Sequence, residues 1–368
     1  MSVIRLKRFC FNKASFYLIA MFISVTLVGN SQPLKVGVVG LSHDHAHSIM
    51  QQYKKGEVII VGIAESDHQL IDRYKKRYQL SDSLFYKTTA LMIANNKLDV
   101  VLAYNPIVDH LAVVEACAPK GISVMVEKPL AVNNQQAERI AVLAKQHKIH
   151  VLTNYETTWY PSNQQVKVMV NQDHDIGDIR KMVVHDGHQG PKEIGCSAEF
   201  LSWLTDPVKN GGGALIDFGC YGANLMTWLM EGKAPVAVTA VTRQIKPSIY
   251  PKVDDDATIL LEYEHATGII EASWNWPFGI KDLEVFGTTG YLHAQNANTL
   301  RGRKKDSYEV VEVKPPAYTN NLTYLAAVLR GEIKPANDLS SLENNLIVVK
   351  ILDAARLSAR DGKRVVLK

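Results

Sequence analysis

Residues 122–130, with the sequence ISVMVEKPL, read as a strand that is buried on both faces and ends in a charged pair. A run of Ile, Val and Met with little charge is typical of a central strand in a parallel sheet. Pro129 removes an N–H from the sheet ladder and disfavours helical backbone at Lys128. We therefore expect the strand to end here, with the lysine held extended.

Ligands of open α/β sheets bind beyond the carboxyl ends of the strands, which is where Lys128 is predicted to lie. Desolvation at that position would lower the proton affinity of the lysine and let it act as an acid or a base. The alternative is an ordinary ion pair at the end of a strand. Lys128 is thus a candidate catalytic residue.

The pattern of an apolar strand followed by a helix repeats along the first half of the chain. Strands are predicted over residues 34–40, 58–66, 98–106 and 122–128, and helices follow through residue 54 and over 69–78, 109–120 and 134–148. Strands that alternate with helices of about 10–15 residues form βαβ units and a parallel sheet. Residues 34–153 are therefore predicted to form one doubly wound α/β domain.

In such a domain the first strand–helix turn binds the phosphates of a dinucleotide if glycines let the backbone approach. The G-x-G-x-x-G pattern falls on Gly40, Ser42 and His45, so the motif alone is weak. Glu65 is the better signal, because it ends the second strand about 25 residues later, where a carboxylate binds ribose hydroxyls. Its charge would repel a 2′-phosphate, which favours NAD over NADP. A solvated glutamate at the end of a strand is the alternative.

His43, His45 and His47 lie at alternate positions in the same turn. Three imidazoles would share one side of an extended chain, but the chain is entering a helix here, so we expect them to diverge. No metal is therefore predicted. Polar contacts near the phosphates or the substrate are the expected role.

Residues 154–368 show a different pattern, with alternating strands separated by turns. The strands cover IRKMVVHDGH, APVAVTAVTR, TILLEYEH, TGIIEASWNW and LEVFGTTGYLHA. They predict an α+β domain with an open, largely antiparallel sheet and one covered face. Two helices, over 320–330 and 342–360, are expected to close this domain.

The stretch GGGALIDFGCYGANL, residues 211–225, is expected to start a helix on which Asp217 and Tyr221 lie one turn apart. A carboxylate beside a phenol can orient a substrate hydroxyl and relay its proton, and a nearby lysine would lower the pKa of the phenol. The alternative is a helix-terminal carboxylate and a packed tyrosine.

Two histidines, His185 and His188, lie where the first strand of this second domain ends. Polar groups of this kind, together with the tryptophans at 203, 274 and 276, suit a pocket for a sugar-like ligand. Each of these residues could instead belong to the core or to an interface.

The composition of the 368-residue chain is that of a globular protein, with 46% hydrophobic and 21% charged residues and a net charge of +4. No basic stripe interleaved with aromatic residues is present, which argues against a nucleic-acid partner.

The N-terminal 31 residues have the pattern of a signal peptide, with basic residues before an apolar run over 14–28 and small residues at 29 and 31. The run is short for a stable membrane span. We expect a periplasmic or secreted protein, with an uncleaved membrane anchor as the alternative.

The combined motifs resemble the family of glucose–fructose oxidoreductase, inositol dehydrogenase and MocA. They are KVGVVG, AES after the second strand, Asn105-Pro106 with His110, VEKPLA, GGGALIDFGCYG and the closing SLENNLIVVKILDAARLSARDGKRV. The resemblance covers nearly all of the chain after the leader. It implies a Rossmann domain, a substrate-binding α+β domain, and NAD(P)-dependent oxidation or reduction of a sugar or cyclitol hydroxyl in a dimer or tetramer.

On this resemblance Lys128 and Asp217 are catalytic and Tyr221 transfers the proton. The cofactor is expected to contact Gly40, Ser42, His43, Glu65, Asn105, Pro106, His110, Glu127 and Lys128. The substrate is expected to contact Lys128, His185, His188, Asp217 and Tyr221. The chain departs from the family in lacking the second and third glycines of the loop, and in lacking an arginine at 159–161.

Two other functions stay open. One is a redox-neutral glycosidase, lyase or epimerase that uses tightly bound NAD for transient oxidation. The other is a sugar-binding protein that has kept the fold without the activity.

Overall fold

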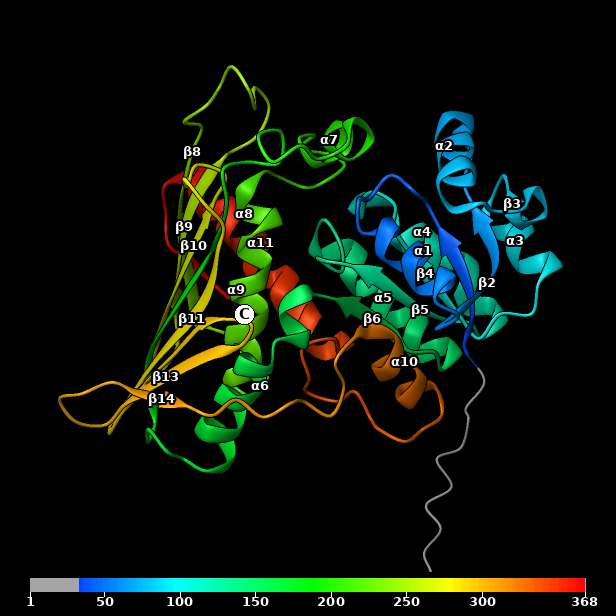
Figure 1. Ribbon diagram of the computed structural model, residues 1–368. Helices are drawn as coiled ribbons and strands as arrows, with labels where there is room; N and C mark the ends of the chain where they lie inside the picture. The colour runs from blue at the N-terminus through cyan, green and yellow to red at the C-terminus, as the bar shows by residue number, and fades with distance from the viewer. Residues whose placement is uncertain (1–32, 368) are drawn as a thin grey trace, which may run out of the picture. The chain divides into compact units, whose positions relative to one another are not determined.

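The computed structural model describes residues 33–367, which are organised around two sheets (Figure 1). Sheet A has six strands and sheet B has nine. The predicted signal peptide lies outside the described residues.

Sheet A is parallel throughout, with the strand order β3-β2-β1-β4-β5-β6. Its strands are β1 (Lys35–Val39), β2 (Ile59–Ala64), β3 (Phe85–Tyr86), β4 (Val100–Ala103), β5 (Ser123–Glu127) and β6 (Val151–Asn154). The order changes direction between β1 and β4, which creates a crevice at the carboxyl ends of these strands. The predicted doubly wound α/β fold is confirmed.

Strand β5, next to the edge strand β6, has all five residues buried, and it pairs with β4 on one side and β6 on the other. It ends at Glu127, and the Lys128–Pro129 peptide bond is cis. The sequence analysis does not predict β3 or β6, which have two and four residues.

Helices cover both faces of sheet A. They are α1 (Ala46–Lys54), α2 (His68–Tyr78), α3 (Thr89–Asn95), α4 (His110–Cys117) and α5 (Asn134–His147), with short 3-10 turns at Asp82–Leu84, Ile107–Asp109 and Ala118–Lys120. Apolar side chains of α1 and α2 pack on one face, and those of α3, α4 and α5 on the other. Asp67 and Asn133 accept hydrogen bonds from first-turn N–H groups and so define where α2 and α5 begin.

Sheet B has the order β14-β13-β12-β11-β7-β10-β9-β8-β15. Its strands are β7 (Ile179–Gly187), β8 (Ala237–Arg243), β9 (Asp256–Glu262), β10 (Thr267–Ser273), β11 (Ile280–Gly287), β12 (Tyr291–Asn296), β13 (Thr299–Arg303), β14 (Glu309–Val311) and β15 (Val365–Val366). All pairs are antiparallel except β7 with β10. The predicted open, largely antiparallel sheet is confirmed.

The sequence predicts one strand over LEVFGTTGYLHA, but the structure contains the hairpin of β11 and β12 there. Thr288 and Gly290 lie in the turn, and a Cβ at Gly290 would meet Ile176 at 2.9 Å. The turn residues, rather than the apolar pattern on either side, therefore decide where this strand reverses.

One face of sheet B is covered by α8 (Ala214–Asp217), α9 (Gly219–Leu229) and α11 (Leu342–Asp361), and no described helix lies on the other (Figure 1). Gly219 and Gly222 let α9 approach closely, because a Cβ there would lie 2.9 Å from Ile259 and 2.6 Å from Ile270. The remaining helices are α6 (Pro161–Lys167), which continues as a π-helix over Val168–Gln172, α7 (Ala198–Leu204) and α10 (Asn321–Leu329).

Helix α10 does not close the second domain as the sequence suggests. Its residues Leu322, Leu325 and Val328 belong to the same apolar cluster as Val36 and Val38 of β1. The C-terminal segment therefore returns to sheet A before α11 packs on sheet B. Among residues 33–367, none of the helices combines the length and apolar composition needed to cross a membrane.

Candidate active site

Lys128 lies immediately after β5 and is only 7% exposed. Its ammonium donates hydrogen bonds to the Asp217 carboxylate and, at 2.8 Å, to the Asp217 carbonyl oxygen. Burial alone would lower the pKa of Lys128, but the attraction of the Asp217 carboxylate outweighs it and raises the pKa above its ordinary value. The expected lowering is therefore wrong, and the lysine stays protonated.

Asp217 is the last residue of α8, and it is 5% exposed. Trp274 donates its indole N–H to the second carboxylate oxygen at 3.0 Å. Burial would raise the pKa of Asp217, but Lys128 holds it below the usual range, so the carboxylate remains ionised. Each of its oxygens thus accepts a hydrogen bond from a neighbouring side chain.

Tyr221 lies in α9, and two ammonium groups lie over its ring. The ring centroid is 5.1 Å from Nζ of Lys128 and 4.6 Å from Nζ of Lys281. Tyr155 packs edge-on against it at 5.4 Å. Lys128 and Tyr221 thus meet across the two parts of the chain, as the sequence predicts.

Two details at Tyr221 differ from expectation. Burial raises its pKa well above the usual range, and the carboxylates of Asp186, Glu156 and Asp217 add to that effect. The net shift is therefore a rise, where the sequence predicts a lowering. The predicted single helix is also wrong, because it breaks at Phe218 between α8 and α9 and the Tyr221 N–H bonds to the Phe218 carbonyl, only three residues back, at 3.1 Å.

The sequence does not single out Lys281, whose Nζ lies 2.5 Å from a carboxylate oxygen of Glu156. Lys281 pairs with Asp186 across β11 and β7, so the two side chains lie on the same face of sheet B. Burial raises the pKa of Asp186 to about 8. In the sequence, a lysine near the start of a strand resembles a solvated residue, so its place beside Asp186 becomes clear only from the strand register.

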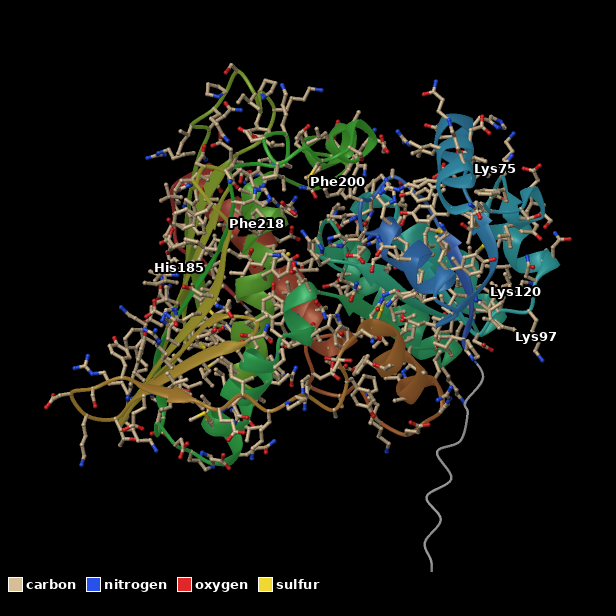
Figure 2. All side chains as sticks on the ribbon, in the orientation of Figure 1. Lys75, Lys97, Lys120, His185, Phe200 and Phe218 are labelled. Carbon is tan, nitrogen blue, oxygen red and sulfur yellow. The ribbon has the colours of Figure 1, made fainter. Side chains whose placement is uncertain are left out.

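The two predicted substrate histidines are placed differently. His188 packs edge-on against Phe218 at 4.9 Å, and burial lowers its pKa, with Asp217, Lys281 and Lys128 nearby. His185 points to the other face of sheet B, where it lies 2.7 Å from Asp282, which also bonds to His293 at 3.1 Å (Figure 2). The structure therefore brings His188, but not His185, to the group around Lys128.

A cavity of about 370 Å³ opens at the carboxyl ends of β1, β2 and β4. It is lined by Gly40, Ser42, Glu65, Asn105 and Pro106 among others. Gly40 has φ +78°, and a Cβ there would lie 2.8 Å from Asn105. The one glycine that the loop retains is the one that this backbone requires.

Glu65 organises the rim of this cavity. One carboxylate oxygen accepts the Leu41 N–H at 2.9 Å, and the other accepts those of Ser66 and Asp67 at 2.7 and 2.9 Å. The buried Oδ1 of Asn105 has no hydrogen-bond partner among the described residues. An unpartnered amide oxygen and a fixed carboxylate beside a tight turn suit a ligand with hydroxyl and amide groups, such as a dinucleotide.

One wall of the cavity comes from α7, far along the chain. Trp203, Ser202 and Glu199 line it, and the Trp203 indole N–H donates to the Ser42 carbonyl at 3.4 Å. The sequence suggests a sugar contact for Trp203, whereas the structure places it against the first strand–helix turn.

Four predicted cofactor residues do not line this cavity, namely His43, His110, Glu127 and Lys128. His110 is fully buried, with Nδ1 3.1 Å from the Leu130 carbonyl oxygen. Burial lowers its pKa to about 4, so it is neutral and supports the segment after β5.

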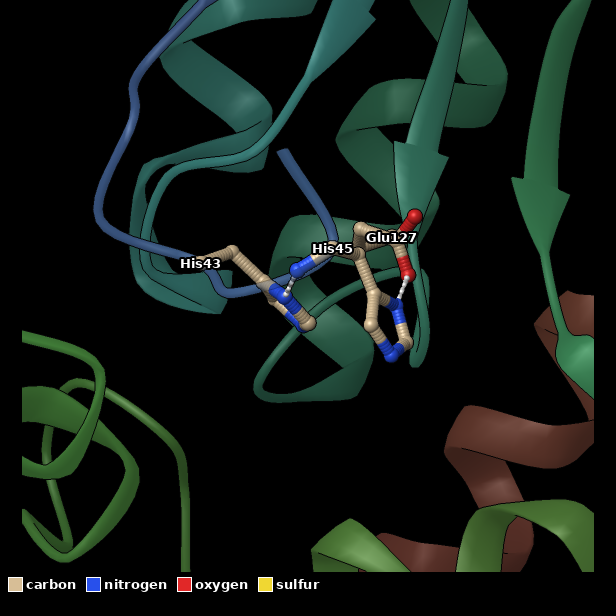
Figure 3. A group of neighbouring side chains, drawn as sticks. All are labelled: His43, His45 and Glu127. Carbon is tan, nitrogen blue, oxygen red and sulfur yellow. Dashed lines mark hydrogen bonds and ion pairs between the residues drawn. The ribbon is translucent and has the colours of Figure 1, made fainter. Parts of the chain in front are cut away.

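His43, His45 and Glu127 form a compact group, shown in Figure 3, with one donor atom of each within 4.8 Å of the others. The predicted divergence is wrong for His43 and His45, whose ring centroids are 4.4 Å apart because both precede α1. It holds for His47, which stacks on Tyr74 at 4.8 Å.

This histidine–glutamate group could supply donors to a divalent metal. Its members are already bonded, since His45 Nδ1 lies 2.9 Å from Glu127 and Asn154 donates to Glu127 at 2.9 Å. Glu127 also raises the pKa of His45 in spite of burial, which favours a protonated ring. The expectation that no metal binds here stays a prediction.

A parallel sheet with a cavity at its switch point is typical of nucleotide-binding α/β folds, and here a buried Lys–Asp–Tyr group accompanies it. A sequence model described as "Oxidoreductase family, NAD-binding Rossmann fold" matches residues 34–155, and the GFO/IDH/MocA C-terminal domain matches residues 163–293. The chain belongs to the Gfo/Idh/MocA family of oxidoreductases, and its first domain binds NAD.

Individual relatives are distant. The rhizopine catabolism protein MocA of Rhizobium meliloti is 27% identical over a region that covers 57% of this chain and 63% of that protein. The aldose–aldose oxidoreductase of Caulobacter crescentus, complexed with glycerol, superposes with a TM-score of 0.77 at 22% identity, over 91% of this chain and 100% of that one. An inositol dehydrogenase homologue of Azotobacter vinelandii with NAD⁺ superposes with a TM-score of 0.78 at 18% identity, over 92% of this chain and 98% of that one. These structures show the fold.

Proposed function

We propose that this chain interconverts a secondary hydroxyl of a sugar, glycoside or cyclitol with the corresponding ketone, using NAD. The observation that carries the proposal is the meeting of Lys128, Asp217 and Tyr221, each at most 7% exposed. The relatives named for an aldose and an inositol support a polyhydroxylated substrate.

The cofactor, when bound, supplies or accepts the hydride. The Lys128 ammonium donates a hydrogen bond to the substrate oxygen, and Asp217 holds that ammonium in position. The Tyr221 hydroxyl gives its proton to the oxygen as a ketone is reduced and takes it back as an alcohol is oxidised. The neighbouring ammonium groups of Lys128 and Lys281 offset part of the cost of forming the phenolate.

Glu65 supports NAD as the cofactor. The 2′-phosphate of NADP would bring negative charge against the Glu65 carboxylate, which three backbone N–H groups already fix in place. NADP is therefore the poorer ligand in this proposal.

The leader supports a working place outside the cytoplasm, in the periplasm or the medium, or at a membrane if the leader is uncleaved. Free dinucleotide is scarce there, so the proposal includes a cofactor that stays bound between turnovers. A homo-oligomer, dimer or tetramer, completes it by analogy with the family.

The decisive variant is Lys128→Ala. It should lower turnover roughly 10²-fold or more while the affinity for NAD changes little, because the ammonium acts on the reacting oxygen. Turnover is measured across a panel of monosaccharides, glycosides and cyclitols, and NAD binding by calorimetry.

The matched variant is Lys209→Ala, since Lys209 lines the dinucleotide cavity and should affect NAD affinity more than turnover. A combined Lys128→Met and Asp217→Asn variant removes both buried charges and checks that lost activity is not lost folding. Equal losses of turnover and NAD affinity in Lys128→Ala would contradict the proposed role.

A further inference from the structure

Asp186 is a buried carboxyl group without a structural partner. It is 1% exposed, its Oδ1 has no hydrogen-bond partner, and within residues 33–367 neither oxygen forms an ion pair. An unpaired buried carboxylate is unfavourable, and hydrogen bonds normally offset such a cost. Packing alone does not explain why a carboxyl group is placed here.

The carboxyl group faces the active site. Asp186 shares the covered face of β7 with Met182 and Val184, which are buried under α9, whereas His185 points to the opposite face. It lies opposite Lys281 of β11. After burial, its charge is the largest influence on the pKa of Tyr221.

The charged groups around it are arranged in two pairs. Lys128 is paired with Asp217, and Lys281 with Glu156. Within residues 33–367 neither ammonium group forms an ion pair with Asp186, although both influence its pKa. Of the carboxyl groups of Asp186, Asp217 and Glu156, only that of Asp186 forms no ion pair within the described residues.

Oxidation of an alcohol requires a single proton acceptor for the hydroxyl, and Tyr221 already fills that role. We propose that Asp186 is a second acid–base residue, which removes a proton from the carbon next to the ketone formed by oxidation of the substrate. The inference rests on the proposed function and extends it from alcohol oxidation to carbon–hydrogen chemistry.

The step is an enolisation. The Asp186 carboxylate takes the proton from the carbon adjacent to the carbonyl, the C–H electron pair becomes the C=C bond, and the carbonyl π pair moves to oxygen. The resulting enolate oxygen lies beside the ammonium of Lys128 and the hydroxyl of Tyr221, which stabilise its charge. Return of the proton to carbon restores the ketone, so no electrons are gained or lost.

The environment suits this chemistry. A base works best when its pKa is near the working pH, and burial raises that of Asp186 to about 8. Once the proton on the carbon next to the carbonyl can be removed, that carbon can be epimerised, or a neighbouring substituent can be expelled, before the ketone is reduced again. The substrate class is thus a sugar or cyclitol that undergoes transient oxidation.

The test supplies the ketone directly, so that no redox turnover is needed. Methyl 3-keto-β-D-glucopyranoside and 2-keto-myo-inositol are incubated in D₂O with the full chain, with and without NAD⁺, and loss of the α-proton signals is followed by NMR. The wild type should exchange at least tenfold faster than buffer with one of these ketones. Asp186→Asn should return the rate to that of buffer.

The matched control is Asp282→Asn, the same change on the neighbouring strand but on the opposite face of sheet B, and it should exchange like the wild type. Exchange by Asp186→Asn at the wild-type rate, or no exchange by the wild type above buffer, would overturn the inference. NADH-dependent reduction of the same ketones by the wild type tests the proposed function separately. A chain that reduces a ketone but does not exchange its protons keeps the function and loses the inference.

Stability gives a second readout that does not depend on activity. Because burial raises the pKa of Asp186, the folded wild type loses stability as pH rises from about 4 to about 8, and Asp186→Asn does not share that loss. The melting temperature of Asp186→Asn should therefore rise relative to that of the wild type as the pH increases over this interval. A variant that is less stable than the wild type by the same amount at every pH would indicate a structural role instead.

Discussion

Buried charges at the active site hold one another in place. The Lys128–Asp217 pair is almost inaccessible to water, and the Trp274 indole satisfies the remaining carboxylate oxygen. Removing one member leaves the other buried and uncompensated, which costs more than the intact pair contributes. Such a pair is better explained by the orientation it gives to an ammonium than by its contribution to stability.

His110 makes a separate prediction about the dependence of stability on pH. Its folded-state pKa is about 4 against an ordinary 6.5, so the unfolded chain binds the additional proton as pH falls between these values. Above pH 6.5 the imidazole is neutral in both states, so it does not reduce the stability. On acidification to pH 4 the free energy of unfolding falls by about 3 kcal/mol, at 1.36 kcal/mol per pKa unit. Urea unfolding of the cofactor-free chain between pH 7 and 4 measures this loss.

The reference for this measurement is His110→Gln, whose free energy of unfolding should fall less over the same interval. Other titrating groups are common to both chains and cancel in the difference. Parallel pH profiles for the variant and the wild type would show that the imidazole does not titrate as described.

At the residue scale, the sequence identifies groups that stand in recognisable motifs. Lys128 is found because a proline ends its strand, and Asp217 and Tyr221 because glycines precede them. Lys281 and Asp186 stand in no motif and meet only through the register of β7 with β11. The protonation states also escape prediction, because they depend on burial and on every neighbouring charge together.

At the scale of elements, α7 does more than connect two strands. Its N-terminal Ser197 N–H bonds to Asp44 at 3.0 Å, Glu199 is paired with Arg73 of α2, and Trp203 lies against the Ser42 carbonyl. The helix is thereby attached to the turn where glycines would normally admit the phosphates. We infer that α7 completes the dinucleotide site that a glycine-poor loop leaves open.

Trp203→Ala should weaken NAD binding about tenfold, since loss of an aromatic wall costs on the order of 1.4 kcal/mol. The measurement is calorimetric titration of the cofactor-free chain with NAD. Leu204→Ala truncates an equally buried neighbour that does not line the cavity, so it should reduce stability without this loss of affinity. Equal affinities for the two variants would argue against α7 as part of the site.

Element type follows from sequence where the pattern is long, as in α11. It fails where the determinant is a local contact. The break at Phe218 arises where Gly219 and Gly222 allow close packing on β9 and β10, and the turn between β11 and β12 packs closely against Ile176. Neither set of partners is adjacent in sequence, so periodicity cannot reveal them.

At the scale of the whole molecule, the described chain crosses between its two sheets more than once. Helix α10 packs with β1, and α11 then contributes Val349 to the cluster over the second face of sheet A and Ile351 and Leu352 to the core of sheet B. Arg356 of α11 donates to the carbonyls of Val132 and Gly211 at 2.8 and 2.7 Å. The candidate active site lies between parts that the C-terminal segment holds together.

That arrangement leads to a prediction about the purified protein. A cavity closed on one side by α7, in a chain that we propose works outside the cytoplasm, should retain its dinucleotide through purification, at close to one NAD per chain. Denaturation followed by mass spectrometry of the released nucleotide measures this ratio. Trp203→Ala, prepared in parallel, should lose most of it because the dissociation rate rises with the lost wall. An empty wild-type chain that binds added NAD only weakly would contradict a retained cofactor, and it would favour a dehydrogenase that meets its dinucleotide afresh in each turnover.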